Sequence, residues 1–328
     1  MVIGRRREPS ADKQTLPEPD TIIRADHLTK RFGRVVAVED LNLSVARGEI
    51  FGLIGPDGAG KTTAIRLLAA IMVPTKGRAT VAGFDTVRQA EKTRRLVGYM
   101  PQRFSLYGDL SVSENLNFFA DIFGVRGQER RERIDQLLHF ARLTEFHKRR
   151  ATHLSGGMQK KLALACTLIH RPQVLFLDEP TTGVDPISRR EFWDILSDLH
   201  LDGVTLLIST PYMDEAERCS RVGLMFEGQL MVSGRPDQLK QSISGEMLAL
   251  NTPRLSQARE LLVTLPGVLE VQLYGDLLHV FVDSAARRRQ QIADRLAEAE
   301  IPIVELRSSR PRMEEAFISL IRRRQEQS

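Results

Sequence analysis

The segment Gly55–Thr62 limits the fold more than any other, because its letters GPDGAGKT match the pattern G-x-x-x-x-G-K-[ST]. The apolar run Ile50–Ile54 before it predicts a buried strand, and Thr63–Ala70 after it predicts a helix. A strand, a glycine-rich loop and a helix in this order cradle a phosphate between backbone N–H groups and the positive end of the helix. Lys61 is expected to reach the β- and γ-phosphates, and the Thr62 hydroxyl to ligate Mg²⁺. The segment therefore predicts a binding site for a nucleoside triphosphate.

The bulk properties predict a soluble protein with one large and one small domain. The 328 residues and the 42% hydrophobic content are enough for a packed core. The longest apolar runs, such as Val204–Ile208, are too short to span a bilayer, and no apolar stretch of a secretory signal follows Arg5–Arg7. Cys166 and Cys219 show no pairing pattern, so a reducing cytoplasm is expected.

The net charge of +5 is modest, and basic residues gather at Arg5–Arg7, Arg126–Arg150 and Arg322–Arg324. Such clusters serve nucleic acid, an anionic membrane surface or only the solvated faces of helices. These clusters lack the aromatic interleaving of proteins that stack on bases. Solvated faces are therefore the favoured interpretation, and no nucleic-acid partner is expected.

The order of strand and helix patterns predicts an α/β fold in residues 21–240, after a loose polar arm at residues 1–20. Val174–Leu177 and Thr205–Ile208 are apolar throughout, as buried parallel strands are. A helix-rich section lies between the predicted strands. One of its helices has an apolar face at helical spacing, formed by Ile134, Leu137, Leu138 and Ala141.

Residues 245–328 predict a second, small α+β domain with the element order βαββαβα. Its expected landmarks are a strand at Glu246–Leu250, a helix capped by Ser256 with Leu261, Leu262 and Leu265 inward, strands Val268–Tyr274 and Leu277–Val282 around a Gly275-Asp276 turn, a helix at Ile292 and Leu296, a strand at Ile303–Leu306 and a helix opened by Pro311. A stabilising appendage is the plain interpretation, and the sequence assigns this domain no chemistry.

Two carboxylates follow the apolar strand Val174–Leu177. Asp178, at the end of the strand, is suited to the Mg²⁺ shell. Glu179 can point the other way and polarise an attacking water, which makes it a candidate catalytic residue. Their position downstream of Gly55–Thr62 fits a nucleotide hydrolase.

A second anion cradle is predicted at Leu154–Met158, whose letters are LSGGM. Ser155 is suited to cap the apolar helix Lys160–Leu168, and Gly156 and Gly157 leave backbone amides free to face an anion. A nucleotide already held by the first cradle does not need a second one. The second cradle is therefore expected to close on the nucleotide of a facing subunit.

Gln102 is a third candidate, on a flexible, proline-flanked segment after Val97–Pro101 that leads to the helix-rich section. A glutamine there is suited to sense Mg²⁺ or water and to shift when nucleotide arrives. The expected metal set is therefore Thr62, Gln102 and Asp178, and Gln102 joins Glu179 as a catalytic candidate.

These residues together resemble the ATP-binding subunit of an ABC transporter, in the ABC-2-type exporter branch that includes multidrug and Ybh-like efflux ATPases. The resemblance covers about Ile22–Lys240, with the principal motifs in order, and implies a P-loop NTPase domain with a helical subdomain. It implies a nucleotide site made of Phe32, which stacks on adenine, with Gly55, Pro56, Asp57, Gly58, Ala59, Gly60, Lys61, Thr62 and Thr63. It implies a signature that acts in trans, made of Leu154, Ser155, Gly156, Gly157 and Met158, and a D-loop with Asp185. Asp57 and Met158 stand where Asn and Gln are commoner, and Met313–Phe317 resembles the end of the C-terminal domain common on this branch.

The resemblance also implies partners and a location. ATP and Mg²⁺ are the expected cofactors, and an integral-membrane ABC-2-type permease is the expected partner. The permease is expected to dock near Phe104–Asn117, which places the chain in the cytoplasm, on the inner face of the cell membrane.

One position departs from the family pattern. After the strand that ends at Thr210 the family expects a histidine that contacts the γ-phosphate, and this chain has Pro211. Proline supplies neither a side-chain donor nor a backbone N–H, and neither His153 nor His170 is placed to substitute for the histidine. The chain's own site is therefore expected to hydrolyse ATP slowly, and a heterodimer with a second, histidine-containing ATPase is favoured over a homodimer.

Two alternatives remain open at this level. One is an ATP-gated regulatory dimerisation module with little catalysis, which Pro211 favours and Glu179 opposes. The other is a soluble ABC protein that acts on ribosomes or DNA. Such proteins usually carry two cassettes or a coiled-coil insert, whereas this sequence has a single P-loop and no heptads.

Overall fold

The computed structural model describes residues 20–103, 106–241, 245–309 and 312–326. Within these residues, backbone contacts divide the chain into two compact units. The first combines the described part of Met1–Glu49 with Thr62–Leu207, and the second combines Ile50–Lys61 with the described part of Ile208–Ser328. The chain therefore passes between the units more than once, and strand β8 (Thr205–Thr210) contains one of the crossings.

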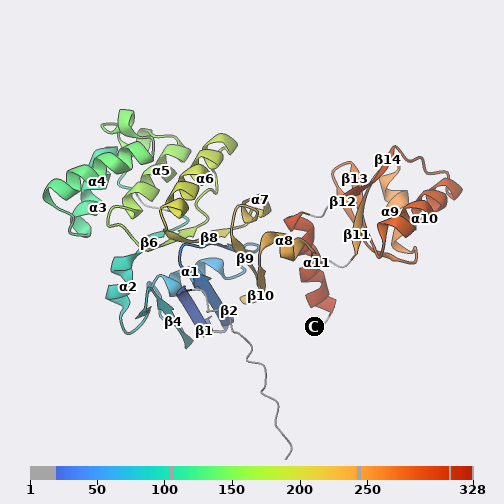
Figure 1. The fold of residues 1–328 in the computed structure, drawn as a ribbon, viewed down its shortest axis with the longest axis horizontal. Coiled ribbons are helices and arrows are strands. Elements are labelled where there is room, and N and C mark those ends of the chain that lie inside the picture. The colour runs from blue at the N-terminus through green and yellow to red at the C-terminus, as the bar shows by residue number, and fades with distance from the viewer. Residues whose placement is uncertain (1–19, 104–105, 242–244, 310–311, 327–328) are drawn as a thin grey trace, which may run out of the picture. The chain divides into compact units, whose positions relative to one another are not determined.

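The first unit contains an antiparallel sheet with the strand order β2-β1-β4-β5 (Figure 1). Its strands are β1 (Thr21–Phe32), β2 (Val35–Ala46), β4 (Lys76–Val81) and β5 (Phe84–Asp85). From Leu41 to Val45, β2 alternates buried apolar and exposed polar residues. This alternation is typical of a sheet that packs one face on the core and leaves the other in solvent.

The same unit holds the parallel pair β6 (Val97–Met100) and β7 (Val174–Asp178). Every residue of β7 is buried, and so is every residue of β8. The two buried strands predicted at Val174–Leu177 and Thr205–Ile208 are confirmed.

Helices α3 to α6 of the first unit lie together in Figure 1. The helices of this unit are α1 (Lys61–Leu68), α2 (Ala90–Leu96), α3 (Val112–Ile122), α4 (Gly127–Phe140), α5 (Gly156–Thr167) and α6 (Pro186–Leu201). The first residue of α1, Lys61, is still counted with the second unit. Short 3₁₀ turns lie at Thr144–Phe146 and Ala151–His153. The apolar face predicted for α4 is buried as expected. The sequence analysis did not identify the capping box of α3, in which the Ser111 hydroxyl accepts from the Glu114 amide while the Glu114 carboxylate accepts from the Ser111 amide.

In the second unit, three strands have the order β10-β9-β3, and β3 and β9 run parallel. They are β3 (Ile50–Ile54), β9 (Arg221–Phe226) and β10 (Gln229–Gly234), followed in the chain by α8 (Pro236–Gln241); α7 (Met213–Ala216) precedes β9. All five residues of β3 are buried, as predicted for the strand before the glycine-rich loop.

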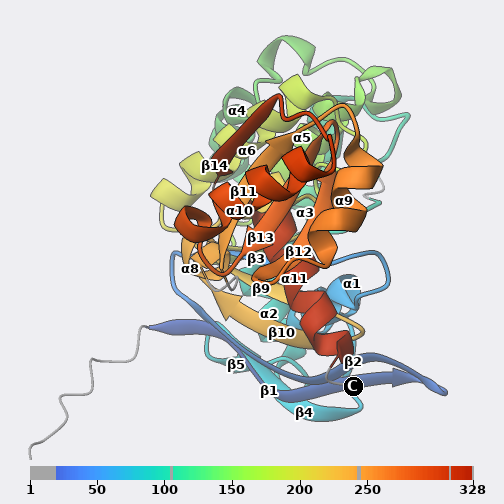
Figure 2. The ribbon, with the colours of Figure 1, turned by 90° about the vertical axis from the view of Figure 1, so that its right-hand side faces the viewer.

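A second sheet of this unit is antiparallel, with the order β12-β13-β11-β14, and α9 and α10 cover one of its faces (Figure 2). The elements are β11 (Glu246–Asn251), α9 (Leu255–Val263), β12 (Val268–Tyr274), β13 (Leu277–Val282), α10 (Ala285–Glu298) and β14 (Glu305–Ser309), and α11 (Met313–Glu326) follows them. The chain order is thus βαββαβα, as predicted. The Gly275-Asp276 hairpin is also confirmed, because Tyr274 pairs with Leu277 and Gly275 has a φ of 55°.

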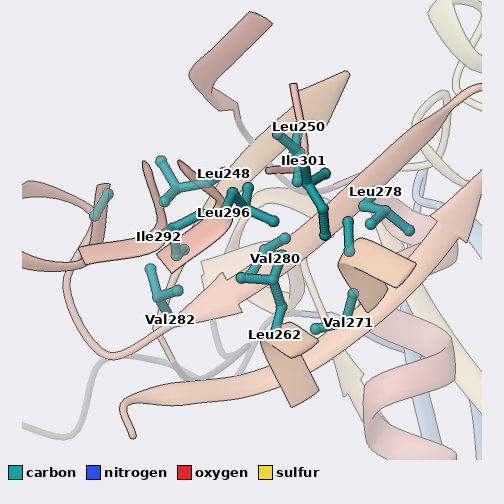
Figure 3. Close-up of a cluster of buried hydrophobic side chains, with 12 residues drawn as sticks. Leu248, Leu250, Leu262, Val271, Leu278, Val280, Val282, Ile292, Leu296 and Ile301 are labelled. Carbon is teal, nitrogen blue, oxygen red and sulfur yellow. The ribbon is translucent and has the colours of Figure 1, made fainter. Parts of the chain in front are cut away.

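Side chains of the sheet and of both helices form one apolar core in this sandwich (Figure 3). Leu248 and Val280 from the sheet and Leu262, Ile292 and Leu296 from the helices are fully buried. Leu262 was predicted to point inward, and Leu261 and Leu265 are partly buried against the same cluster.

Two predictions about this sandwich are wrong in detail. Ser256 does not cap α9: the cap position is Arg254, whose amide donates to the Thr252 hydroxyl at 3.3 Å, so the helix starts earlier than predicted. The strand predicted at Ile303–Leu306 begins only at Glu305, because Ile303 packs against the core cluster before the ladder starts. Pro311, predicted to open the last helix, lies outside the described residues.

The last described helix, α11, joins two parts of the second unit. The buried Glu315 carboxylate near its start meets Nδ1 of the buried His279 on β13 at 3.0 Å. Its body packs against α7 and α8, and Figure 1 shows it beside α8. The helix therefore contacts both the sandwich, through Glu315, and the pair α7 and α8.

Other predictions concern the chain as a whole. Among the described residues, no helix combines the length and the apolar character needed to cross a membrane. Cys166 and Cys219 are free and buried, as the sequence indicated, and burial raises the pKa of the Cys219 thiol to about 12.

Candidate nucleotide-binding site

The glycine-rich loop after β3 already holds its lysine. Lys61 is 4% exposed, and its ammonium donates to the backbone carbonyls of Gly55 at 2.8 Å and Pro56 at 3.0 Å. The backbone carbonyls of the loop therefore hold the Lys61 ammonium inside it.

Glycine is required at several positions of this loop, for physical reasons that differ from one position to the next. Gly58 and Gly60 have φ values of 78° and 97°, which side chains rarely adopt. At Gly55 the limit is space, because a Cβ there would lie 2.1 Å from the carbonyl oxygen of Met225 on β9. Asp57 and Gly58 are exposed at the tip of the loop.

In the first unit, Thr62 and Asp178, each expected from the sequence to bind Mg²⁺, contact each other. The Thr62 hydroxyl donates to Oδ1 of Asp178 at 3.0 Å, and Asp178 is fully buried at the end of β7. A hydroxyl and a carboxylate oxygen are hard ligands that suit Mg²⁺, which takes its remaining ligands from water and substrate phosphates. No cluster of three or more His, Cys, Asp or Glu occurs in the described part of the chain.

Glu179 is held by two donors. It is 6% exposed, with a φ of 48°, and its Oε2 accepts from the Gln102 amide at 2.8 Å and from the Thr182 hydroxyl at 3.3 Å. The structure thus brings together the two residues that the sequence analysis proposed as catalytic, in a contact that the sequence did not predict. Thr182 is an additional site residue.

The LSGGM segment opens α5. The Ser155 hydroxyl accepts from the Met158 amide at 3.3 Å, which confirms Ser155 as the cap; the helix starts at Gly156, earlier than the predicted Lys160. Leu154 and Gly157 are buried, whereas Ser155 and Gly156 are exposed. The two glycines therefore differ: Gly157 packs inside the unit, and Gly156 presents its backbone outward.

Sequence reasoning missed Lys160 on α5. Its ammonium donates to the backbone carbonyl of Gln102 at 3.1 Å. Burial lowers the pKa of Lys160, and the charges of Glu179 and Asp178 oppose that effect. The missed signal was a lysine two residues after LSGGM, one helical turn from Gly156 and Gly157.

Asp185 is the N-cap of α6. Its Oδ1 accepts from the amides of Ile187 at 3.1 Å and Ser188 at 2.9 Å, and hydrogen bonds from Ser188 lower the pKa of Asp185. Asp185, predicted to lie in the D-loop, therefore also stabilises the start of α6.

Phe32 ends β1 and is 47% exposed, with the Lys30 ammonium 5.1 Å from the ring centroid. This exposure rules out a core role for the ring. Thr63 is half-buried in the first turn of α1.

The segment around Pro211, in the second unit, is ordered by Thr210. The Thr210 hydroxyl donates to the buried Glu215 carboxylate at 2.6 Å and accepts from the Tyr212 amide at 3.0 Å. Pro211 thus lies in a fixed turn without a donor of its own.

In the first unit, Nε2 of His170 contacts the Val97 carbonyl at 3.0 Å, and its ring stacks on Phe123. His170 is engaged in packing, consistent with the expectation that it does not substitute for the missing histidine.

Comparison with known proteins agrees with this arrangement. Residues 38–182 match the family model described as ABC transporter. The chain is 42% identical over 308 residues to the probable multidrug ABC transporter ATP-binding protein YbhF of Escherichia coli, covering 92% of this chain and 52% of that protein. It thus spans about half the length of this relative. It is 36% identical to the daunorubicin resistance ATP-binding protein DrrA3 of Streptomyces coeruleorubidus, covering 92% of this chain and 96% of the relative.

Solved structures give the same picture for the fold. The ATP-binding cassette MJ0796, in a dimeric post-hydrolysis state bound to ADP and Pi, has a TM-score of 0.59 and 26% identity, covering 65% of this chain and 98% of the cassette. A subunit of an ABC transporter complex, cbiO1 from Clostridium perfringens, has a TM-score of 0.61 and 27% identity, covering 75% and 96% of the two chains. The P-loop NTPase fold with mixed helix and sheet is confirmed.

Proposed function

The chain belongs to the ATP-binding subunits of ABC transporters, whose general activity is ATP hydrolysis, and on that premise we propose that it binds MgATP and energises export through a membrane permease. The observation that carries the proposal is the hydrogen bond between Thr62 and Asp178. Glu179, the next residue in the chain, accepts a hydrogen bond from Gln102. In this proposal Thr62 and Asp178 would bind the metal, and Glu179, the residue after Asp178, would act as the general base.

Each residue has a stated role in this proposal. The backbone from Gly55 to Gly60, with Lys61 and Thr63, holds the phosphates, and Phe32 stacks on the adenine. Thr62, Asp178 and Gln102 would hold Mg²⁺, which would neutralise charge on the phosphates. Glu179 accepts the proton of the attacking water.

The signature segment supports an assembly in pairs. Ser155 and Gly156 are exposed at the start of α5, where the amides and the positive end of the helix attract an anion. We assign this cradle to the γ-phosphate of ATP bound to a second ATP-binding subunit.

The proposed role in export and the proposed permease partner are supported by the names of related proteins. Those most similar to this chain include proteins named for multidrug transport, daunorubicin resistance and Nod factor export. An ABC-2-type permease would dock near residues 104–117, of which Phe104 and Ser105 lie outside the described residues. The site would then work in the cytoplasm at the inner face of the membrane, with the cassette in residues 21–240 and the small domain in residues 245–328.

Pro211 makes the chain's own site the slower of a pair. Phosphoryl transfer depends on donors aimed at the developing charge, and loss of one donor costs about 10²–10³ in rate at comparable sites. A partner subunit that carries the histidine, completed by this chain's LSGGM segment, would supply most of the hydrolysis. A heterodimer is therefore favoured. Pro211 also favours an ATP-gated regulatory module as a second candidate function.

The experiment is to purify the chain alone and measure ATP affinity and phosphate release. ATP binding that is lost in Lys61→Ala, with slow release that rises when the second ATPase and permease are added, supports the proposal. Brisk hydrolysis by the chain alone contradicts the impaired site, and absence of ATP binding contradicts the function itself. Unchanged low turnover in the full assembly favours the regulatory module.

A further inference from the structure

Two hydrogen bonds in series join the signature helix to the catalytic carboxylate within one chain. The Lys160 ammonium donates to the Gln102 backbone carbonyl at 3.1 Å, and the Gln102 side-chain amide donates to Oε2 of Glu179 at 2.8 Å. Lys160 lies two residues beyond the LSGGM segment, in the same helix α5. Among the described residues of the first unit, the contacts of Lys160 do not include Thr62, so its role is not that of a direct partner of this expected metal ligand.

Gln102 needs such an anchor. It is exposed and follows β6, which ends at Met100, and neither Gln102 nor Arg103 lies in a helix or strand. No regular hydrogen-bond ladder fixes its backbone, so a side chain that holds its carbonyl sets where its amide points. Lys160 can do this because α5 is fixed by its own packing: Lys161 is paired with Glu191, and Leu162 and Leu164 are buried.

Lys160 and Gln102 line the same cavity as the start of the signature helix. A cavity of about 450 Å³ is lined by Gln102, Gly156, Lys160 and Thr182. The outward-facing signature glycine and both donors to Glu179 thus border one cavity. Because Lys160 lies in α5, a rigid-body shift of this helix would carry Lys160 with it and so move Gln102 as well.

We infer that Lys160 is a positioning residue: it holds Gln102 where its amide can both orient Glu179 and reach the metal, and so links the signature helix to the catalytic carboxylate of the same chain. This inference rests on the proposed function, because it assigns Gln102 a task toward MgATP. It adds a route by which engagement of the signature with a second subunit's nucleotide alters the chain's own site.

A plain charge effect is the competing explanation. Lys160 lies close enough to Glu179 and Asp178 for their charges to act on it. Removing its charge would then make the electrostatic potential at the carboxylates more negative, and Mg²⁺ would bind more tightly. Loss of a positioning residue acts in the opposite direction, because Gln102 no longer holds its place. The sign of the change therefore separates the two explanations.

The test compares ATP affinity with Mg²⁺ and with a chelator in the full chain. Lys160→Met is expected to lower the ratio of the two affinities by roughly three- to tenfold, the range for one lost hydrogen bond to a site group. Lys160→Arg keeps a donor and is expected to retain the wild-type ratio, and Lys148→Met, at an exposed lysine of the same unit, serves as the matched control. A raised ratio in Lys160→Met overturns the inference in favour of the charge effect, and an unchanged ratio overturns it outright.

A double-mutant cycle with Gln102→Ala checks the route. This variant keeps the backbone carbonyl but lacks the amide, so Lys160→Met is expected to change nothing further in its background. A full effect of Lys160→Met in that background contradicts the route through Gln102. Hydrogen exchange of residues 97–103 in the nucleotide-free chain adds a readout without metal, and faster exchange is expected in Lys160→Met but not in Lys148→Met. If the wild-type chain itself binds no ATP, the proposed function fails instead, and the two failures are distinguished.

Discussion

Gly157 of the signature lies against Ser188 of α6 so closely that a Cβ on the glycine would be 2.5 Å from both Cβ and Oγ of the serine. Ser188 cannot retreat easily, because its amide is held by Asp185, the cap of the same helix. At the neighbouring Gly156 the nearest such atom is 3.9 Å away. One glycine of the motif is therefore required by packing inside the chain, and the other is not.

We expect Gly157→Ala to destabilise the chain by about 1–3 kcal/mol through overpacking. Gly156→Ala is expected to leave stability unchanged or raise it slightly, because alanine favours the helix. Thermal unfolding measures both. Gly156→Ala should instead weaken ATP-driven pairing of subunits, measured by size-exclusion chromatography with MgATP. Equal stability of the two variants would contradict the packing argument.

The bond between Thr62 and Asp178 predicts a specific loss of metal dependence. Thr62→Val keeps the shape of the side chain but removes the hydroxyl, so Mg²⁺ should enhance ATP binding at least about tenfold less than in the wild type, as for loss of other groups that support a metal. Isothermal titration with and without a chelator provides the measurement. Affinity without metal is the internal control and should stay the same; a parallel fall in both affinities would show damage to the cradle instead.

Restoring an imidazole at position 211 should speed hydrolysis in this chain's own site. Pro211→His adds the missing donor, and we expect turnover of the chain alone to rise by about 10²-fold. Pro211→Ala is the matched control, because it restores the backbone N–H without an imidazole. An equal rise in both variants would assign the effect to the backbone, and no rise in Pro211→His would mean that Pro211 is not the limiting defect.

The contact between Glu315 and His279 predicts a pH dependence in the second unit. Burial alone would raise the pKa of Glu315, but bonds from His279 and from the amides of Glu315 and Arg312 outweigh it and hold the pKa below its usual value of 4.5. A carboxyl whose folded pKa is depressed adds stability above its unfolded pKa and loses it as pH falls through the folded pKa. Protection of β13 and α11 from hydrogen exchange should therefore decline as pH drops below about 4.5.

Glu315→Gln tests this assignment. It should cost about 1–3 kcal/mol at pH 7, because a buried partner loses its charge-assisted bond, and it should flatten the acid decline. Glu314→Gln, at the exposed neighbouring residue, is the control and should behave as the wild type. A decline of the same size in Glu315→Gln would place the titrating group elsewhere.

The sequence allowed a good prediction of the elements whose signal is local. The strand at Ile50–Ile54, the Gly275-Asp276 hairpin and the cap at Ser155 depend on patterns a few residues long, and all three are confirmed. The start of α9 was misplaced because Ser256 is a good cap by type, whereas Thr252 fixes the entry of the chain.

Contacts between distant segments could not be predicted in this way. The sequence named Gln102 and Glu179 separately, but their hydrogen bond depends on how β6 and β7 pair. Lys160 had no signal apart from its place after LSGGM, and the different burial of Gly156 and Gly157 depends on α6. Such features come from tertiary packing, which a single sequence does not reveal.

The return of α11 to α7 and α8 has a consequence for biosynthesis. The ribosome makes α7 and α8 before the sandwich, and α11 only after β14. The side of α7 and α8 that α11 covers in the folded chain therefore stays exposed while the small sheet is synthesised and folds. The surface that α11 covers begins at α7, two residues after Pro211, so packing of this part of the chain is complete only when the last described helix has been made.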